Sequence, residues 1–392
     1  MDSTAKQMRA YTGPALFSFG FRPFFLFGAL WAALVVPIWT LAYMGLIPAE
    51  FASRDWHVHE MLFGYLAAIV AGFLLTAVPN WTGRLPVVGA PLAALFALWV
   101  AGRVAMLFVA TLGPWAGAID SLFLIGFALV IWREVLAGRN TRNLPVCVMV
   151  TLLAVANIAF HLRVPAPDAV WIGERIALAV AAMLIALIGG RIVPSFTRNW
   201  MAKRSMTPQP AQQSRFDLFA MGLAGAALVL WMLAPLVAFT GWALIIGGAA
   251  LMLRLARWQG WRTAAEPLVS ILHIGYLWLG VAIALLGVSA LAPDIVLPTA
   301  GVHALAAGAI GVMTLAVMTR ATRGHTGQEL TAPWGTQAIY TLINAGALLR
   351  VASALVPTSQ TTLLVASAFL WSAAFVFFAI VYGPLLLTAR RA

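Results

Sequence analysis

The sequence predicts an all-α protein that crosses a membrane about twelve times, and three observations support this fold class. Hydrophobic residues make up 62% of the 392 positions, charged residues make up only 9%, and the mean hydropathy is +0.94. A soluble domain could not bury so much apolar surface. The apolar character also continues along the whole chain without a long polar break, so we expect a single membrane domain.

Each membrane span needs roughly 20 mostly apolar residues, and turn signals such as Pro208-Gln209-Pro210 separate the apolar runs. In chain order, the predicted helices occupy residues 24–43, 57–79, 90–111, 117–136, 145–162, 171–190, 218–236, 241–258, 268–288, 299–319, 334–354 and 362–387. The expected organisation is a cytoplasmic N-terminal segment at 1–23, a twelve-helix transmembrane domain at 24–388 and a cytoplasmic C-terminal tail at 389–392.

The distribution of basic residues predicts the orientation in the membrane. With the N-terminus inside, most of the 24 Lys and Arg residues fall on cytoplasmic segments, and only Arg54 and Arg163 fall outside. The cytoplasmic set includes the terminal residues Lys6, Arg9, Arg390 and Arg391. The positive-inside rule therefore places both termini in the cytoplasm. Because the basic residues form short clusters between apolar runs, the net charge of +12 reflects topology, and we expect no nucleic-acid partner.

A weak internal repeat favours three four-helix units. The segment 59–64, which opens the second helix with His59, is similar to the segment 303–308, which opens the tenth helix with His303. At the same offset, Trp81-Thr82-Gly83 aligns with His325-Thr326-Gly327, and the sixth helix ends comparably at 194–200. Helices 2, 6 and 10 are then equivalent. The alternative is coincidence between apolar segments of low complexity.

Six histidines are the candidate metal ligands, because Cys147 is the only cysteine and cannot form a thiolate cluster. Ionisable residues inside a membrane are costly, so each is a functional candidate. Neutral imidazole is a natural ligand for heme iron and for copper. On the predicted topology, the outer helix ends carry His57, His59, His161 and His303, and the inner side carries His273 and His325. A histidine at a membrane interface can also simply cap a helix or reach the headgroups, and this alternative stays open for each.

The densest group is Trp56-His57-Val58-His59-Glu60-Met61. In a regular helix, His57 and His59 point about 200° apart and would not ligate one metal. An unwound start to this helix would change that. Glu60 could then orient an imidazole as an acceptor, or it could simply be a negative charge at a helix N-terminus.

Other polar groups within the predicted helices are candidates to hold a cofactor. Arg103 and Arg175 could bind heme propionates, because a guanidinium donates paired hydrogen bonds to a carboxylate. A polar contact within the helix is an equal alternative for each.

At the inner side, two basic loops at 190–200 and 319–327 face each other. Anchoring to anionic lipid explains their arginines, while a second metal site or a proton path would also use His273 and His325.

Several segments together resemble the NnrS family over essentially the whole chain. These are Gly20-Phe21-Arg22-Pro23-Phe24-Phe25, the group at 56–61, Ala77-Val78-Pro79-Asn80-Trp81-Thr82-Gly83, Asn157-Ile158-Ala159-Phe160-His161, His273-Ile274-Gly275-Tyr276 and the loop at 318–327. The resemblance implies a multi-pass protein of the bacterial inner membrane that carries heme, expected to be b-type, and copper. It also implies a role in nitric oxide metabolism or in protection against nitrosative stress, with nitric oxide as ligand and an electron donor as a further partner.

The arrangement is also similar to that of the heme-copper oxidase superfamily, in which low-spin heme lies between outer histidines of helices 2 and 10. This comparison favours His59 and His303 as axial heme ligands and leaves His57 and His161 as candidates for copper. Three function classes stay open: a heme-copper protein that binds or converts nitric oxide, a transporter of a metal or metal-nitrosyl species, and a structural membrane component. The sequence leaves open whether nitric oxide is converted or only bound.

Overall fold

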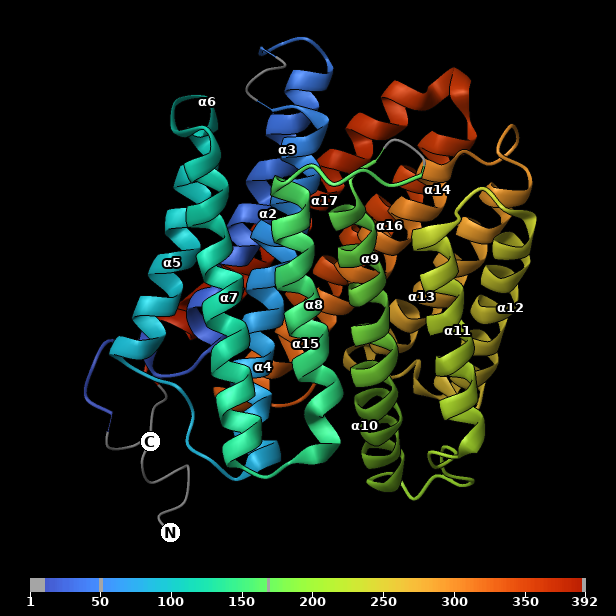
Figure 1. Ribbon diagram of the computed structural model, residues 1–392. Coiled ribbons are helices and arrows are strands. Elements are labelled where there is room, and N and C mark those ends of the chain that lie inside the picture. The colour runs from blue at the N-terminus through green and yellow to red at the C-terminus, as the bar shows by residue number, and fades with distance from the viewer. Residues whose placement is uncertain (1–10, 49–51, 168–169, 390–392) are drawn as a thin grey trace.

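The computed structural model describes residues 11–48, 52–167 and 170–389, and apart from one isolated β-bridge the regular structure in these ranges is helical (Figure 1). Twelve helices are long and apolar enough to cross a membrane, so the predicted fold class is confirmed. Four basic residues that support the predicted orientation, Lys6, Arg9, Arg390 and Arg391, lie outside the described residues.

The spans are numbered 1 to 12 in chain order. They are formed by α2 (Phe21–Tyr43); α3 (Arg54–His59), η2 (Glu60–Leu66) and α4 (Ala67–Thr82); α5 (Ala90–Leu107); α7 (Pro114–Ala137); η3 (Thr141–Asn143) and α8 (Leu144–His161); α9 (Ile172–Leu184), η4 (Ile185–Gly189) and α10 (Gly190–Ala202); α11 (Arg215–Leu233); α12 (Ala238–Ala256); α13 (Pro267–Leu291); α14 (Pro298–His303), η6 (Ala304–Ile310) and α15 (Gly311–His325); α16 (Trp334–Leu355); and η7 (Pro357–Ser359) with α17 (Gln360–Leu387). The connections contain the short helices η1 (Ala15–Phe17), α6 (Val109–Leu112) and η5 (Gly260–Thr263).

The helix ends differ from the sequence prediction mainly at the C-terminal ends of spans 6 and 10. The apolar runs stop near residues 190 and 319, but α10 continues to Ala202 and α15 continues to His325. The two segments expected to be basic loops are therefore largely helical. Hydropathy marks where the apolar run stops, whereas backbone hydrogen bonding continues into the polar interface.

The spans form three four-helix groups that close into a ring. α2 packs against α17, α7 packs against α8, and α12 packs against α13, which joins each group to the next. Spans 2, 6 and 10 contact one another on the inside of this ring. Spans 2 and 10 also have the largest buried shares, 78% and 72%, as expected for helices enclosed by others.

Spans 2, 6 and 10 share a further feature, because each contains a π-helical segment in which the backbone is locally widened. The segment η2 begins directly after His59, and η6 begins directly after His303. π-Helical turns occur frequently at functional sites. Their recurrence agrees with the equivalence of these three helices that the repeat predicts.

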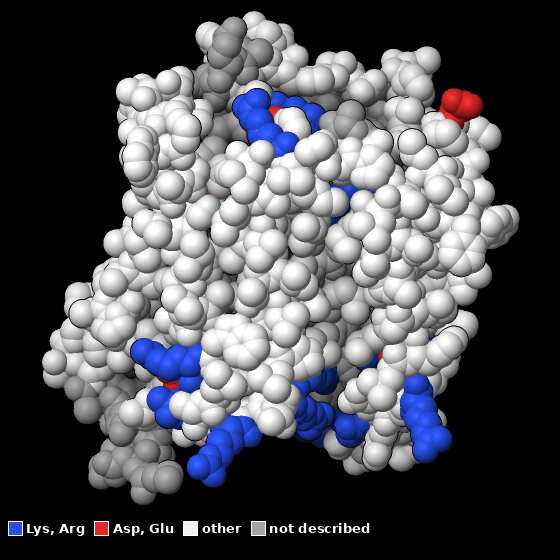
Figure 2. All heavy atoms as spheres, viewed as in Figure 1, with Lys and Arg blue, Asp and Glu red and all other residues white. Residues whose placement is uncertain are grey.

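Lys and Arg side chains gather at the end of the molecule where α4, α7 and α10 finish, as Figure 2 shows. Arg84, Arg139 and Lys203 follow these three helix ends in the sequence. The opposite end exposes few basic side chains in this view. The charge asymmetry between the two ends is thus a property of the folded molecule.

Candidate functional site

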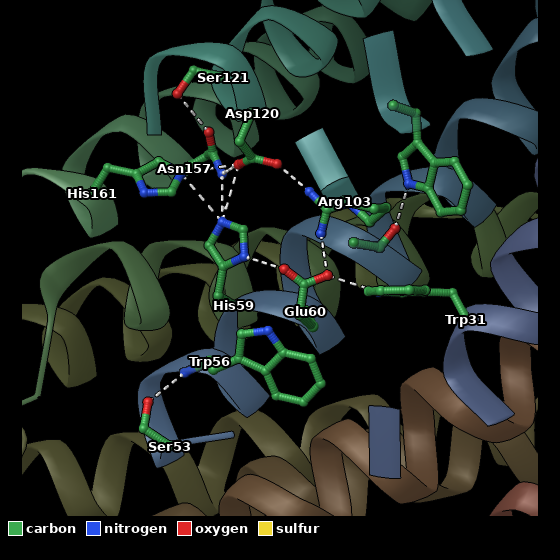
Figure 3. A network of polar contacts seen from close by, with 12 residues as sticks. Trp31, Ser53, Trp56, His59, Glu60, Arg103, Asp120, Ser121, Asn157 and His161 are labelled. Atoms are coloured by element: carbon green, nitrogen blue, oxygen red, sulfur yellow. Dashed lines mark hydrogen bonds and ion pairs between the residues drawn. The ribbon is translucent and has the colours of Figure 1, made fainter. Parts of the chain in front are cut away.

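Two histidines and one aspartate converge between spans 2, 4 and 5 (Figure 3). His59 Nε2 lies 3.0 Å from Asp120 Oδ2 and 3.2 Å from His161 Nε2, and His161 Nε2 lies 2.9 Å from the same Asp120 oxygen. A metal bound by nitrogen or oxygen at 2.0–2.1 Å in tetrahedral geometry separates its ligand atoms by about 3.3 Å. The three atoms are therefore already spaced as ligands of a single ion.

We call His59, Asp120 and His161 the metal triad. Asn157 lies beside the triad and binds its carboxylate. The Asn157 side-chain nitrogen donates to Asp120 Oδ2 at 2.8 Å, and the Asn157 oxygen accepts from Ser121 Oγ at 2.9 Å. Asn157 and His161 share one face of α8 because they are four residues apart. The amide thus holds the carboxylate in place without being one of the three ligand atoms.

Glu60 orients the His59 ring from the other side. His59 Nδ1 donates to Glu60 Oε1 at 2.8 Å, which leaves the Nε2 lone pair directed at the triad. Such a carboxylate partner raises the basicity of a ligating imidazole and fixes its orientation. The second Glu60 oxygen accepts from Trp31 Nε1 at 2.7 Å and from Arg103.

Arg103 joins the two carboxylates, since it donates to Glu60 and also to Asp120 Oδ1. It is buried, as are His59, Glu60 and Asp120, whereas the His161 side chain is 17% exposed and forms the accessible edge of the cluster. Two carboxylates and one guanidinium leave one formal negative charge when the imidazoles are neutral. A buried charge of this kind needs a partner, and a bound cation would supply it.

Three glycines provide the space for this polar cluster. A Cβ atom at Gly64 would lie 2.5 Å from Arg103 Nη1, and one at Gly102 would lie 2.7 Å from Asp120 Oδ1. A Cβ atom at Gly117 would lie 2.8 Å from the His161 ring. Any other residue at these positions would force the cluster to move.

His57 and His303 lie at a different site. They line a cavity of about 400 Å³ near the ends of spans 2 and 10, and both also line a smaller neighbouring cavity. We call the larger space the outer cavity. His303 Nδ1 donates to the Thr299 carbonyl at 2.8 Å, which leaves its Nε2 lone pair available to a ligand. The His57 ring stacks on Trp39 with 4.5 Å between ring centroids, and its Nδ1 is buried without a hydrogen-bond partner among the described residues.

The structure therefore pairs the four outer histidines differently from the sequence analysis. His59 and His303 do not share a site, because His59 faces the triad while His303 faces the outer cavity. The opposite directions of His57 and His59 follow from their spacing in α3, which stays helical up to η2 and begins with the Ser53 hydroxyl accepting from Trp56 N. An unwound start to this helix is not observed.

The two arginines predicted to bind heme propionates, Arg103 and Arg175, lie at different sites. Arg103 is bound to Glu60 and to Asp120, so it is not available to a propionate in the outer cavity. Arg175 lines the outer cavity and donates to the Trp231 carbonyl at 2.6 Å. Arg54 and Arg350 line it as well: Arg54 binds Glu174 with both oxygens at 2.9 and 3.0 Å, and Arg350 donates to the Ser353 hydroxyl at 2.8 Å.

The two remaining histidines are near the opposite end of the molecule. His273 Nε2 lies 2.7 Å from the Thr197 hydroxyl, and its Nδ1 is buried without a partner among the described residues. His325 is the last residue of α15, not part of a loop, and its ring contacts Phe19 and Phe21. Neither joins a group of three potential ligands within the described ranges, where the triad is the one such group.

The sequence motifs and the fold agree with the comparison to protein families. The model of the family described as NnrS protein matches residues 15–390. The chain belongs to the NnrS family. The resemblance noted in the sequence is thereby confirmed, and no curated protein matches the chain.

In this NnrS-family chain, Asp120 is the residue that sequence analysis missed. It is the single acidic residue in the apolar first half of span 4, and such a residue inside a membrane is a functional candidate by its cost alone. The predicted metal ligands were all histidines, so a mixed set of nitrogen and oxygen ligands was not anticipated.

Proposed function

We propose that this NnrS-family protein binds copper at the metal triad and a b-type heme in the outer cavity, and that it acts on nitric oxide in the bacterial inner membrane. Both termini would lie in the cytoplasm, at the basic end of the molecule. The observation that carries the proposal is the division of the four outer histidines into two separate sites, each with two imidazoles and its own charged neighbours.

The outer cavity suits heme in its ligands and its charge. Imidazoles from spans 2 and 10 face a common space of about 400 Å³ with mainly apolar walls such as Leu178, Leu286 and Val302. Three arginines and one glutamate line it, so its wall carries an excess of positive charge that two propionates would balance. His57 and His303, in place of His59 and His303, would then hold the heme iron.

Arg350 is the arginine best placed for a propionate. It lines both cavities, and its only hydrogen-bond partner among the described residues is the Ser353 hydroxyl. Arg54 is already bound to a carboxylate, and Arg175 is already bound to a carbonyl. A guanidinium without an anionic partner in a low-dielectric wall favours an acidic ligand.

The triad suits copper because imidazole and carboxylate ligands bind divalent copper strongly among the first-row metals. Bound iron and copper would supply one-electron chemistry and a position for nitric oxide. The residues of the chain would hold and orient the metals. Glu60 fixes the tautomer of His59, and Thr299 fixes that of His303. The burial of His59 and Asp120 keeps water away from these two ligands.

The proposal is tested by the absorption spectrum and metal content of the purified protein. His57→Ala and His303→Ala should each abolish the Soret band while copper stays bound, and His161→Ala should remove copper while the Soret band stays. His325→Ala, at the opposite end, is the matched control and should keep both. Wild-type protein without heme and without copper would refute the proposal and favour the transporter hypothesis.

Nitric oxide binding needs a separate measurement. Nitric oxide added to the reduced protein would have to replace one of the two imidazoles on the iron, and this exchange should shift the Soret band in the wild type and in His161→Ala. Turnover with an added electron donor then distinguishes conversion from binding. No spectral response in the wild type would contradict a nitric oxide role at the heme.

The role of Arg350 is tested by reconstituting heme-free protein with heme or with its dimethyl ester, which lacks the two acids. The wild type should prefer heme by about tenfold or more, and Arg350→Gln should lose most of this preference. An unchanged preference in Arg350→Gln would exclude this residue as the propionate partner.

A further inference from the structure

A second cavity lies at the other end of spans 2, 6 and 10, near the inner ends of α4, α10 and α15. Its volume is about 340 Å³. The walls are mainly apolar and aromatic, and they include Phe25, Phe73, Trp81, Phe196, Leu272 and Leu330. No acidic residue lines it in the described part of the chain. We call this space the inner cavity.

Arg320 provides the charge of the inner cavity. Its guanidinium carbon lies 3.8 Å from the centre of the Phe196 ring, so the flat group stacks on the aromatic wall. It has no hydrogen bond and no ion pair with any described residue. Arg320 thus lines the cavity with N–H donors that have no hydrogen-bond acceptor among the described residues.

Neighbouring arginines at the same end differ in this respect. Arg323 donates to the Glu329 carbonyl at 2.6 Å, Arg191 donates to the Asn143 side chain at 2.6 Å, and Arg254 binds Asp217 at 3.0 Å. Each of these three guanidinium groups has a hydrogen-bond acceptor within the protein. Arg320 is instead held against an apolar wall, which indicates that its partner comes from outside the chain.

The inner cavity also accounts for sequence motifs that the outer sites do not use. The signature segments 77–83 and 318–327 and the segment 190–200 provide Asn80, His325 and Phe196 as wall residues. Metal binding at the opposite end gives these segments no role. A ligand in the inner cavity would be contacted by all three.

We propose that the inner cavity binds an anionic phospholipid of the inner leaflet, with its phosphate on Arg320 and its glycerol and first acyl carbons against the aromatic walls. A basic pocket between transmembrane helices is a known type of site for acidic lipid headgroups. A free inorganic anion fits less well, because the apolar walls would remove its hydration and return a single charged contact. The basic side chains at this end of the molecule attract anions to it (Figure 2).

Lipid titration of the detergent-purified protein tests this site. Phosphatidylglycerol should raise the melting temperature of the wild type by a few degrees, whereas phosphatidylcholine and inorganic phosphate should not. Arg320→Gln should weaken phosphatidylglycerol binding by about tenfold or more, measured by native mass spectrometry. Arg323→Gln removes one positive charge from the same end and is the matched control, which should bind lipid like the wild type.

A second variant keeps the test decisive if Arg320→Gln folds poorly. Ala321→Phe leaves Arg320 in place but fills the cavity that Ala321 lines, and it should also lose the phosphatidylglycerol response. Equal losses in Arg320→Gln and Arg323→Gln would show a diffuse charge effect and overturn the proposal. Stabilisation by inorganic phosphate as strong as that by phosphatidylglycerol would overturn the lipid assignment. None of these readouts depends on heme or copper.

Discussion

Single residues decide which of the two outer sites a histidine joins. His57 and His59 are separated by one residue, and their spacing alone predicts that they point in opposite directions. The partners of each could not be predicted, because Asp120 and Asn157 come from spans that only the folded bundle brings beside α3. The six histidines could be identified as candidate ligands from the sequence alone. The grouping of His59 and His161 with Asp120 could be found only in the tertiary structure.

Replacing Glu60 by Gln should lower copper affinity by about 10- to 100-fold, because the His59 ring loses its anionic acceptor. Competition with a copper chelator measures this change. Glu134→Gln is the control, since Glu134 is also a buried acidic residue but pairs with Arg84 at the inner end of α7. Equal copper affinity in the wild type and Glu60→Gln would exclude the orienting role.

Gly64→Ala should destabilise the protein by about 1–3 kcal/mol, because the added Cβ would crowd Arg103, Glu60 and Trp31. Copper content should fall with it. Gly222→Ala in α11 is the matched control: its Cβ would meet no atom within 4 Å, so a stabilisation of about 0.8–1 kcal/mol is expected. Thermal unfolding of both variants checks the pair, and identical melting temperatures would contradict the crowding argument.

At the scale of elements, the sequence predicted twelve helices with most ends in the correct place, because apolar runs and turn residues mark them directly. It did not predict that α10 and α15 extend into the basic segments, nor that spans 2, 6 and 10 contain π-helical turns. A π-helical turn depends on the packing around it and leaves no hydropathy signal. In span 2 this turn sets the direction of α3, and hence of both outer histidines, relative to α4.

Deleting Met61 should convert η2 toward regular α-helix and rotate α3 by about 100° relative to α4. Both the Soret band and the copper content should then be lost, since His57 and His59 turn away together. Deleting Ile188 from η4 makes the same backbone change in a span without histidine, and copper should remain. Retention of both cofactors after the Met61 deletion would show that η2 does not set the site geometry.

At the scale of the whole molecule, the ring of three four-helix groups separates the two outer sites from the inner cavity along the length of spans 2 and 10. The basic end of the molecule fixes how this arrangement should lie in a membrane. The sequence alone predicts an orientation, because the positive-inside rule depends on residue type and order and not on packing, and this orientation stays a prediction.

Cysteine labelling in intact cells tests that orientation. In a Cys147→Ser background, a cysteine at Ser359 should react with a membrane-impermeant thiol reagent, because Ser359 is exposed at the start of span 12, on the predicted outer side. A cysteine at Gln209, exposed between spans 6 and 7, should react only after permeabilisation. The reverse pattern would invert the topology and place the triad at the cytoplasmic face.

The single turn of α3 that carries His57 and His59 links the two outer sites thermodynamically. A metal bound to His59 restrains this turn and so prepays part of the entropy cost of holding His57 for heme. Copper should therefore raise heme affinity, and heme should raise copper affinity by the same factor, within the roughly 5- to 150-fold range typical of such coupling. Heme titrations of the wild type with and without copper measure this factor, which should vanish in His161→Ala. Whichever cofactor is loaded first during assembly would then prepare the site of the other.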